Sequence, residues 1–198
     1  MKHLIVVAHP NVGSLTMELA RRYTEQVQSL GHSPQLVDLY RVGFNPVLTA
    51  GELTDDAPAR ANPELVTAQE DLRAVAVLTV IYPLWWLSMP AILKGYIDRV
   101  FARGFAYESR EGTVHGLLKG KRCVLITLSG APLSTFAADG RWNAVQSLQD
   151  THIFRSAGFE LLEHLHIAEV HPNLSRQTVD GHVERVKDCA RRHFGPPR

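Results

Sequence analysis

Three short stretches of the sequence carry residue types that could bind an anionic or planar ligand. The first is HPNVGSLT, from His9 to Thr16, which follows an apolar run and leads into a segment with helical spacing. Ser14 suits a helix N-cap, so the free N–H groups of the first turn, around Leu15 to Met17, could bind an anion with the help of the helix dipole. His9 could add a donor. In a simpler interpretation, Ser14 only caps the helix and His9 bonds to the backbone.

The second stretch, YPLWWLSMP, contains the adjacent tryptophans Trp85 and Trp86. Neighbouring side chains point in different directions, so at least one ring should meet a ligand or a partner subunit, where large rings contribute buried area and stacking. The alternative is one packed and one surface tryptophan. The third stretch runs from Ser129 to Pro132. Its residues are small enough for main-chain N–H groups to approach the edge of a planar heterocycle, although alone it is only a turn.

Motifs for several other chemistries are missing. No G-x-G-x-x-G follows the first apolar run, and neither G-x-x-x-x-G-K-[ST] nor G-x-S-x-G occurs. His164, His166 and His171 could suggest a metal, but their spacing fits no standard zinc site and no carboxylate partner is evident, so no metal site is predicted. Four charges on expected helices are interpreted as solvated: Asp71, Arg73, Asp98 and Arg99.

Composition excludes further classes of protein. Charged residues make up 21% and hydrophobic ones 45%, which is ordinary for a soluble globular chain. A formal net charge of +1 gives no field that would attract nucleic acid or an anionic membrane. Two cysteines form no disulfide framework, so a reducing cytoplasm is expected.

An uncharged run of membrane-spanning length extends over residues 74–93. Pro83 and Pro90 would each interrupt a continuous helix within it. The first part is rich in Val and Ile, whose branched side chains favour strands. The sequence therefore predicts a strand, a turn and a helix beginning at Pro90, rather than a membrane span.

Apolar periodicity divides the chain into alternating strands and helices. The expected strands are 4–8, 35–39, 75–82, 122–128 and 160–168. The expected helices are 16–30, 63–73, 90–102, 141–157 and 176–194, with a long connection at 40–63 and a loop or small hairpin at 103–119. This alternation indicates an α/β fold, a doubly wound parallel sheet in a single domain over residues 1–198, with helices on both faces. Such a sheet binds ligands beyond the carboxyl ends of its strands, where the three stretches lie.

Four blocks carry a resemblance that runs from the first strand to about Ala168, over most of the chain: HPNVGSLT, VDLYRVGFNP, the highly specific YPLWWLSMPAILKGYIDRVFARGFAY, and HIFRSAGFE. Together they resemble the flavodoxin-like NAD(P)H:quinone oxidoreductases, which include quinone reductases and the ancillary flavoproteins of bacterial potassium-efflux systems. The resemblance implies five strands in the order 2-1-3-4-5, a bound flavin, and a homodimer with its active site at the interface. FMN is favoured over FAD, because the connection 40–63 has little room for an adenosine-binding extension.

The resemblance also implies roles for individual residues. The flavin phosphate would lie against His9, Ser14, Leu15 and Thr16. The flavin ring would lie against Pro83, Leu84, Trp85, Trp86, Ser129 and Gly130. Substrate contacts would come from Phe105, Tyr107 and Phe136, the first two of which would line the cavity of the partner subunit.

The implied reaction passes a hydride from NADH or NADPH to flavin N5 and then to a quinone or similar acceptor, in two half-reactions. Many relatives carry a Tyr and a His in the loop after the fourth strand, but residues 133–140 contain neither. The histidine position falls near Asp139, so Asp139 and Tyr107 are only weak catalytic candidates, and nitro or azo acceptors stay open. The alternative function is a regulatory subunit docked on a potassium-efflux transporter. A one-electron carrier is disfavoured, since such carriers tend to be acidic.

Overall fold

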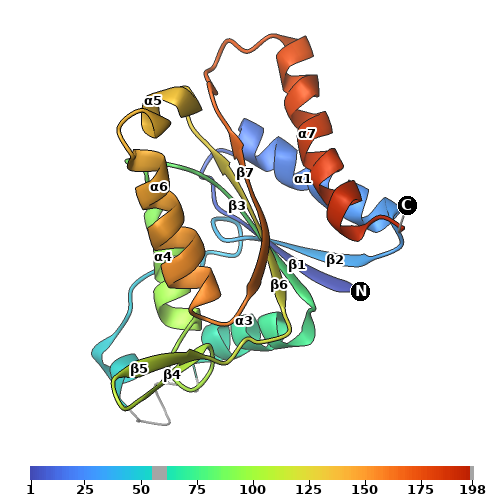
Figure 1. The fold of residues 1–198 in the computed structure, drawn as a ribbon. Helices are drawn as coiled ribbons and strands as arrows, with labels where there is room; N and C mark the ends of the chain where they lie inside the picture. Colours follow the sequence, from blue (N-terminus) through green and yellow to red (C-terminus); the bar gives the residue numbers. More distant parts are fainter. Residues whose placement is uncertain (55–61, 197–198) are drawn as a thin grey trace.

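A parallel five-stranded sheet forms the centre of the computed structural model, which describes residues 1–54 and 62–196. Its strands are β1 (Lys2–Val7), β2 (Ser33–Asp38), β3 (Val77–Pro83), β6 (Arg122–Leu128) and β7 (Glu160–Ile167). Across the sheet they follow the order β2-β1-β3-β6-β7 (Figure 1). Counted along the chain, this is the predicted order 2-1-3-4-5, so the predicted flavodoxin-like α/β fold is confirmed.

Helices cover both faces of the sheet (Figure 1). On one face lie α1 (Leu15–Ser29) and α7 (Arg176–Phe194). On the other lie α3 (Pro63–Ala74), α4 (Ala91–Val100) and α6 (Arg141–Val145), which continues as a π-helix over Gln146–Arg155. Each face has its own apolar core, and β3 is buried along its whole length, as expected for a strand covered on both sides.

The uncharged run 74–93 divides as the prolines predict. It forms β3, then a tight turn, and then the beginning of α4, with Pro90 directly before the first helical residue. No helix within residues 1–54 and 62–196 has both the length and the apolar character needed to cross a membrane.

The segments around residues 103–119 and 133–157 add detail to the predicted elements. The first is a hairpin of β4 (Tyr107–Arg110) and β5 (Thr113–Gly116), as expected. The second was expected to be a loop and one helix, but a short helix, α5 (Leu133–Ala137), precedes α6, and Gly140 with φ 79° separates the two. The π-helix buries Gln149 and Asp150 against the sheet, and such segments are frequent at functional sites.

The connection between β2 and α3 is held by a buried cation on α4. Arg99 is 2% exposed, so its interpretation as a solvated helix charge was wrong. Its guanidinium donates to Glu64 at 2.7 Å, to Glu52 of the short 3-10 helix η1 (Ala50–Leu53) at 2.9 Å, and to the carbonyl oxygen of Asn45. It also lies over the ring of Phe44. Residues 55–61 of the predicted connection lie outside the described part of the chain.

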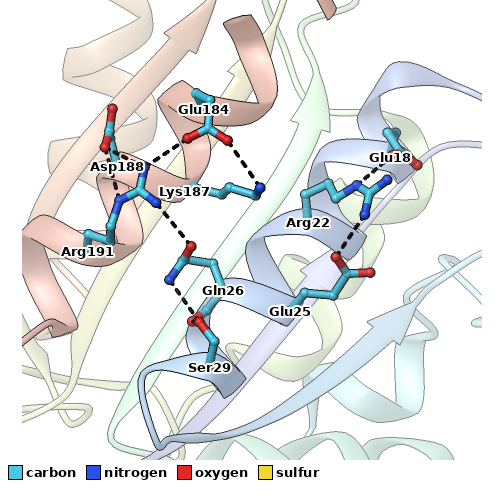
Figure 2. A network of polar contacts seen from close by, with 9 residues as sticks. All are labelled: Glu18, Arg22, Glu25, Gln26, Ser29, Glu184, Lys187, Asp188 and Arg191. Carbon is cyan, nitrogen blue, oxygen red and sulfur yellow. Dashed lines mark hydrogen bonds and ion pairs between the residues drawn. The ribbon is translucent and has the colours of Figure 1, made fainter. Parts of the chain in front are cut away.

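Exposed charges join α1 and α7 at the surface (Figure 2). Arg191 pairs with Glu184 at 3.0 Å and Asp188 at 2.7 Å, and its other terminal nitrogen donates to Gln26 of α1 at 3.3 Å. Exposed ion pairs contribute about 0–1 kcal/mol each. The two helices are therefore held mainly by the apolar residues beneath, such as Tyr23 and Val186.

Replacing Arg99 by Met should lower the free energy of unfolding by about 3–5 kcal/mol, because two carboxylates lose their buried partner. Arg99 also lowers the pKa of Glu52 by hydrogen bonding. The resulting stabilisation is complete above the ordinary glutamate pKa of about 4.3, and it is lost as pH falls through the lowered value. In the Arg99→Met variant, the free energy of unfolding should not show this decrease at acidic pH. Urea denaturation between pH 3 and 7 measures both effects.

The matched control is Arg110→Met, which removes an arginine whose side chain is 71% exposed in its ion pair. This control should change stability by less than about 0.5 kcal/mol. Equal losses in the two variants would contradict a structural role for the buried cation.

Candidate functional site

Three loops lie together at the carboxyl edge of the sheet. They follow β1, β3 and β6, which are adjacent in the sheet and run parallel. Parallel strands end at the same edge, so the stretches that sequence analysis selected separately become neighbours.

The loop after β1 is ordered by its own side chains and by a distant arginine. The Asn11 N–H donates to Nδ1 of His9 at 3.1 Å, and Oδ1 of Asn11 accepts from the Gly13 N–H at 2.8 Å. Arg41 donates to the carbonyl oxygens of His9 and Pro10, at 3.3 and 2.8 Å. Burial lowers the pKa of His9, and Arg41 adds to this effect, so the ring is neutral at pH 7. Sequence analysis missed Arg41, because it follows β2 rather than β1.

Ser14 caps α1, as its type predicted. Its hydroxyl oxygen accepts from the Met17 N–H at 3.3 Å. The N–H groups of Leu15 and Thr16 have no acceptor within the described residues. Two donors therefore remain free at the positive end of the helix.

The loop after β3 is a tight turn under backbone strain. The main chains of Trp85 and Ser88 exchange two hydrogen bonds, of 3.1 and 3.0 Å. Between them, Trp86 and Leu87 have φ values of 54° and 59°, a left-handed conformation that disfavours bulky side chains. The Trp86 side chain is 100% exposed, and the Trp85 ring lies 5.7 Å from the ring of His9. Strain of this kind is concentrated at ligand-binding sites.

The loop after β6 contains both paired and free main-chain N–H groups. The Ser129 N–H donates to the carbonyl oxygen of Ile167 at 3.0 Å, so it is not available to a ligand. The carbonyl oxygen of Ser129 accepts from the Val170 N–H at 2.9 Å. Within the described part of the chain, the N–H groups of Gly130 and Ala131 have no acceptor. Main-chain donors toward a ligand edge are therefore supplied one and two residues later than Ser129.

A pocket of about 330 Å³ unites the last two loops. Its lining consists of Leu84, Trp86, Leu87, Ser129, Gly130, Ala131, Phe136 and Arg141. Predicted residues that do not line it are His9, Ser14, Leu15, Thr16, Pro83, Trp85, Phe105 and Tyr107.

A larger groove adjoins this pocket. It encloses about 1210 Å³ between α4, the β4–β5 hairpin and the α6 π-helix, and it contains Phe105 and Tyr107. Trp86, Leu87 and Arg141 line both spaces. The hairpin lies far from α5 along the molecule (Figure 1). One chain therefore does not bring its own Phe105 and Tyr107 into the pocket at Ser129.

Arg141, rather than the weak candidate Asp139, lines the pocket. Asp139 lines neither space, and its carboxylate accepts from Arg141 Nε at 2.7 Å, which lowers the pKa of Asp139. Arg141 also lies over the ring of Phe136. The pocket therefore gains a guanidinium, which sequence analysis missed, and Asp139 is an ionised counter-ion beside it.

The histidines considered for a metal have another arrangement. His164 and His166 both contact the hydroxyl of Thr127, at 2.8 and 2.9 Å. Nδ1 of His164 also lies 2.7 Å from the carboxylate of Asp150. This is the carboxylate partner that was not evident from the sequence, because Asp150 comes from the π-helix.

A different group of potential ligand atoms comes from Glu163, Cys189 and His193, all within 4.8 Å of one another. Arg192 and His193 already bond the carboxylate of Glu163, at 2.7 Å each. Burial raises the pKa of the Cys189 thiol, which keeps it protonated. These residues form a satisfied ion-pair cluster between β7 and α7.

Comparison with known families agrees with this geometry. Residues 1–189 match a family described as having a flavodoxin-like fold. The chain belongs to this flavodoxin-like family. The chain is 35% identical to a Haemophilus influenzae protein named an uncharacterized NAD(P)H oxidoreductase. The match covers 86% of this chain and 85% of that relative. It is 26% identical to NAD(P)H dehydrogenase [quinone] 1 of Rattus norvegicus, over 93% of this chain and 76% of the relative.

Among solved structures, the NAD(P)H:quinone oxidoreductase of Methanothermobacter marburgensis shares the fold with a TM-score of 0.86. The two chains are 24% identical, and the match covers 96% of this chain and 98% of that one. The predicted resemblance to NAD(P)H oxidoreductases, and the prediction that the flavodoxin-like chain is an enzyme of this kind, are confirmed by these relatives.

Replacing Trp86 by Asn should raise the free energy of unfolding by about 1 kcal/mol, since Asn tolerates the left-handed conformation and the exposed indole loses no packing. For a chain of this size the melting temperature should rise by roughly 2–4 °C. Thermal unfolding of the ligand-free protein measures the shift, and Trp86→Phe, which keeps the strain, should leave it unchanged. A lower melting temperature for the Asn variant would refute a strained turn.

Proposed function

We propose that this protein is a flavin-dependent NAD(P)H oxidoreductase that reduces a quinone or a similar electrophilic acceptor. The observation that carries the proposal is the convergence of three loops with free N–H donors and an exposed aromatic ring at one edge of the sheet. The names of the relatives support the donor and the class of acceptor.

The loop after β1 fits the phosphate of the flavin. Free N–H groups at Leu15 and Thr16 would donate to phosphate oxygens, and the helix dipole would favour the negative charge. Arg41 adds a positive charge beside the same loop. One phosphate group could accept from both N–H groups, so we propose FMN as the flavin.

The loops after β3 and β6 fit the flavin ring. Leu84 and Trp86 would supply apolar contact, and Gly130 and Ala131 would donate main-chain N–H groups to the polar edge of the ring. When bound, the flavin accepts a hydride at N5 from NADH or NADPH and passes it to the acceptor in alternating half-reactions. Arg141 would stabilise negative charge on an acceptor that lies against Phe136.

A second copy of the chain would complete the acceptor site. The groove between α4 and the π-helix carries exposed apolar side chains, including Leu148 (62% exposed) and Val114 (55%). Contiguous apolar surface of this kind marks an interface, and a two-fold dimer is the commonest way to cover it. In such a homodimer, Phe105 and Tyr107 of one copy would face the pocket of the other. The two unbonded, buried cysteines suit a cytoplasmic enzyme.

Ser14 provides the test of this function. Ser14→Asp keeps an N-cap but places a negative charge against the phosphate, so the dissociation constant for FMN should rise at least tenfold, or about 1.4 kcal/mol. Ser14→Asn is the matched control, because it caps without charge and should bind FMN normally. Flavin fluorescence measures binding, and NADH or NADPH oxidation with a quinone measures turnover.

Turnover by the wild type should depend on added FMN and on the quinone, and turnover by Ser14→Asp should recover only at higher FMN concentration. Equal FMN affinity for the Asp and Asn variants would show that the flavin phosphate does not bind at this loop. A fully FMN-loaded protein that oxidises neither nucleotide would overturn the proposed function.

A further inference from the structure

A continuous chain of hydrogen bonds leads from the π-helix to the pocket. Its members, called the relay here, are Asp150, His164, Thr127, His166 and Ser129. Successive contacts measure 2.7 Å from Asp150 to His164, 2.8 Å from His164 to Thr127, 2.9 Å from Thr127 to His166 and 2.9 Å from His166 to Ser129. Every contact joins side-chain atoms, and the last member lines the pocket. Sequence analysis noticed His164, His166 and Ser129 separately, but neither Asp150 nor Thr127.

The register of the sheet creates the relay. Thr127 of β6 pairs directly with His166 of β7. His164 precedes His166 by two residues, so both rings project from the same face of the sheet, with the threonine hydroxyl between them. The indole of Trp142 lies 5.0 and 4.8 Å from the two imidazoles, and covers them from α6.

Solvent has little access to the relay. Thr127 is 0% exposed, and His166 and Ser129 are each 7% exposed. The side chains of His164 and Asp150 are 2% and 9% exposed. Protons therefore enter or leave along the hydrogen bonds, rather than through water around each group.

The number of hydrogens on Ser129 and His166 determines which atom donates and which accepts at the pocket end of the relay. Ser129 has one hydroxyl hydrogen, which it donates to the carbonyl oxygen of Ala131 at 2.9 Å. The hydrogen between Ser129 and His166 must then come from Nε2 of the imidazole. Burial, His164 and Arg185 lower the pKa of His166 to about 4, so this ring is neutral and its Nδ1 is a bare acceptor.

The same count fixes the inner end. Thr127 must give its one hydrogen to the bare Nδ1 of His166, so its oxygen has to accept from Nε2 of His164. On the other side of His164, Nδ1 faces the carboxylate of Asp150, and a carboxylate accepts hydrogen bonds without donating any. Both ring nitrogens of His164 therefore carry hydrogen, and the ring is an imidazolium paired with Asp150.

Other ionisable groups surround this pair without competing for its proton. Tyr82 of β3 and Cys123 of β6 face Asp150, and burial raises the pKa of both well above the ordinary values. The Tyr82 hydroxyl donates to Gln149, next to Asp150. Arg185 of α7 donates to the carbonyl oxygen of His166 at 2.9 Å. Neither Tyr82 nor Cys123 therefore offers a negative charge that would draw the proton away from His164.

We propose that the relay stores one proton on His164 and delivers it through the Ser129 hydroxyl to the flavin proposed above. The inference rests on that proposed function, because the flavin supplies the proton acceptor. The relay would replace the Tyr and His that residues 133–140 lack. His164, Thr127, His166 and Asp150 are positioning residues here, and Ser129 alone would touch the ligand.

The proposed step conserves protons and moves no electrons within the relay. Ser129 turns from Ala131 to the ligand and releases its hydroxyl hydrogen to a ring nitrogen or oxygen that has gained negative charge. Ser129 takes a hydrogen from Nε2 of His166, Nδ1 of His166 takes one from Thr127, and Thr127 takes one from Nε2 of His164. One proton leaves His164 and one reaches the ligand. The three hydrogen bonds between His164 and Ser129 then point the opposite way, whereas Nδ1 of neutral His164 still donates to Asp150.

The decisive variant is Thr127→Val, which keeps the shape of the side chain and removes the central hydroxyl. Thr127→Ser should restore the relay. The matched control is Thr79→Val, because Thr79 is equally buried in the neighbouring strand and its hydroxyl donates to Tyr23, which is not part of the relay. With a quinone as acceptor, kcat of the FMN-loaded Thr127→Val enzyme should fall by about 10²-fold at unchanged KM, since general-acid help is worth at least that factor.

A purely structural role of Thr127 would not change the protonation of His164 and His166. NMR of ¹⁵N-histidine-labelled protein measures this protonation. In the flavin-free wild type at pH 7, His164 should be an imidazolium and His166 should carry hydrogen on Nε2. After FMN is bound and reduced with dithionite, His164 should become neutral and His166 should carry hydrogen on Nδ1. In Thr127→Val neither ring should change upon reduction, whereas Thr127→Ser and Thr79→Val should behave as the wild type.

Bound, fully reduced FMN with unchanged ring protonation in the wild type would overturn the relay and leave the proposed function intact. A flavin-free protein with a neutral His164 would overturn the stored proton, whether or not FMN binds. A protein that binds no FMN would instead overturn the proposed function, and with it the acceptor of the relay.

Discussion

The parallel alignment of β1, β3 and β6 is the constraint on which the rest of the structure depends. Because these three strands are adjacent and end at one edge, a capped helix, a strained tryptophan turn and a small-residue loop are brought together from distant parts of the sequence. None of these features would define a site alone. Their convergence supplies free N–H donors, positive charge and aromatic surface within one region, as ligand sites of open α/β sheets require.

The energetics of this edge differ from those of the core beneath it. Apolar residues on both faces of the sheet, such as Leu93 and Tyr23, stabilise the fold by burial. At the edge, Trp86 and Leu87 hold left-handed backbone conformations, and an indole is left fully exposed. Natural proteins keep such local strain where a ligand repays it. The fold therefore supports a turn that would be unfavourable in isolation.

The sequence predicted the parts of the structure that depend on local pattern. Apolar periodicity located the five strands, the family resemblance implied their order, and Ser14 was correctly expected to cap α1. Pairings between distant segments carry no such local signal. Arg99 was mistaken for a solvated charge, because its partners lie 35 and 47 residues away. Arg141 gave no signal, since only the folded loop turns it toward the pocket.

The relay was hidden for the same reason. His164 and His166 were noticed as a pair on one strand face, but the carboxylate of Asp150 depends on the π-helix, and Thr127 depends on sheet register. The loop after β6 was expected to offer main-chain N–H groups, but the sequence did not show that the Ser129 N–H extends the ladder to β7 and that Gly130 and Ala131 keep the free ones. A sequence pattern identifies which loops meet, whereas register and hydrogen-bond count decide which atoms remain free.

An anaerobic spectral titration of the FMN-loaded protein tests the central claim most directly, that the converging loops hold a flavin in position to react with a nicotinamide. The account predicts a yellow protein whose visible absorbance bleaches with one equivalent of NADH or NADPH per flavin and returns when a quinone is added. A protein that stays colourless in the presence of FMN, or a bound flavin that neither nucleotide can reduce, would contradict it.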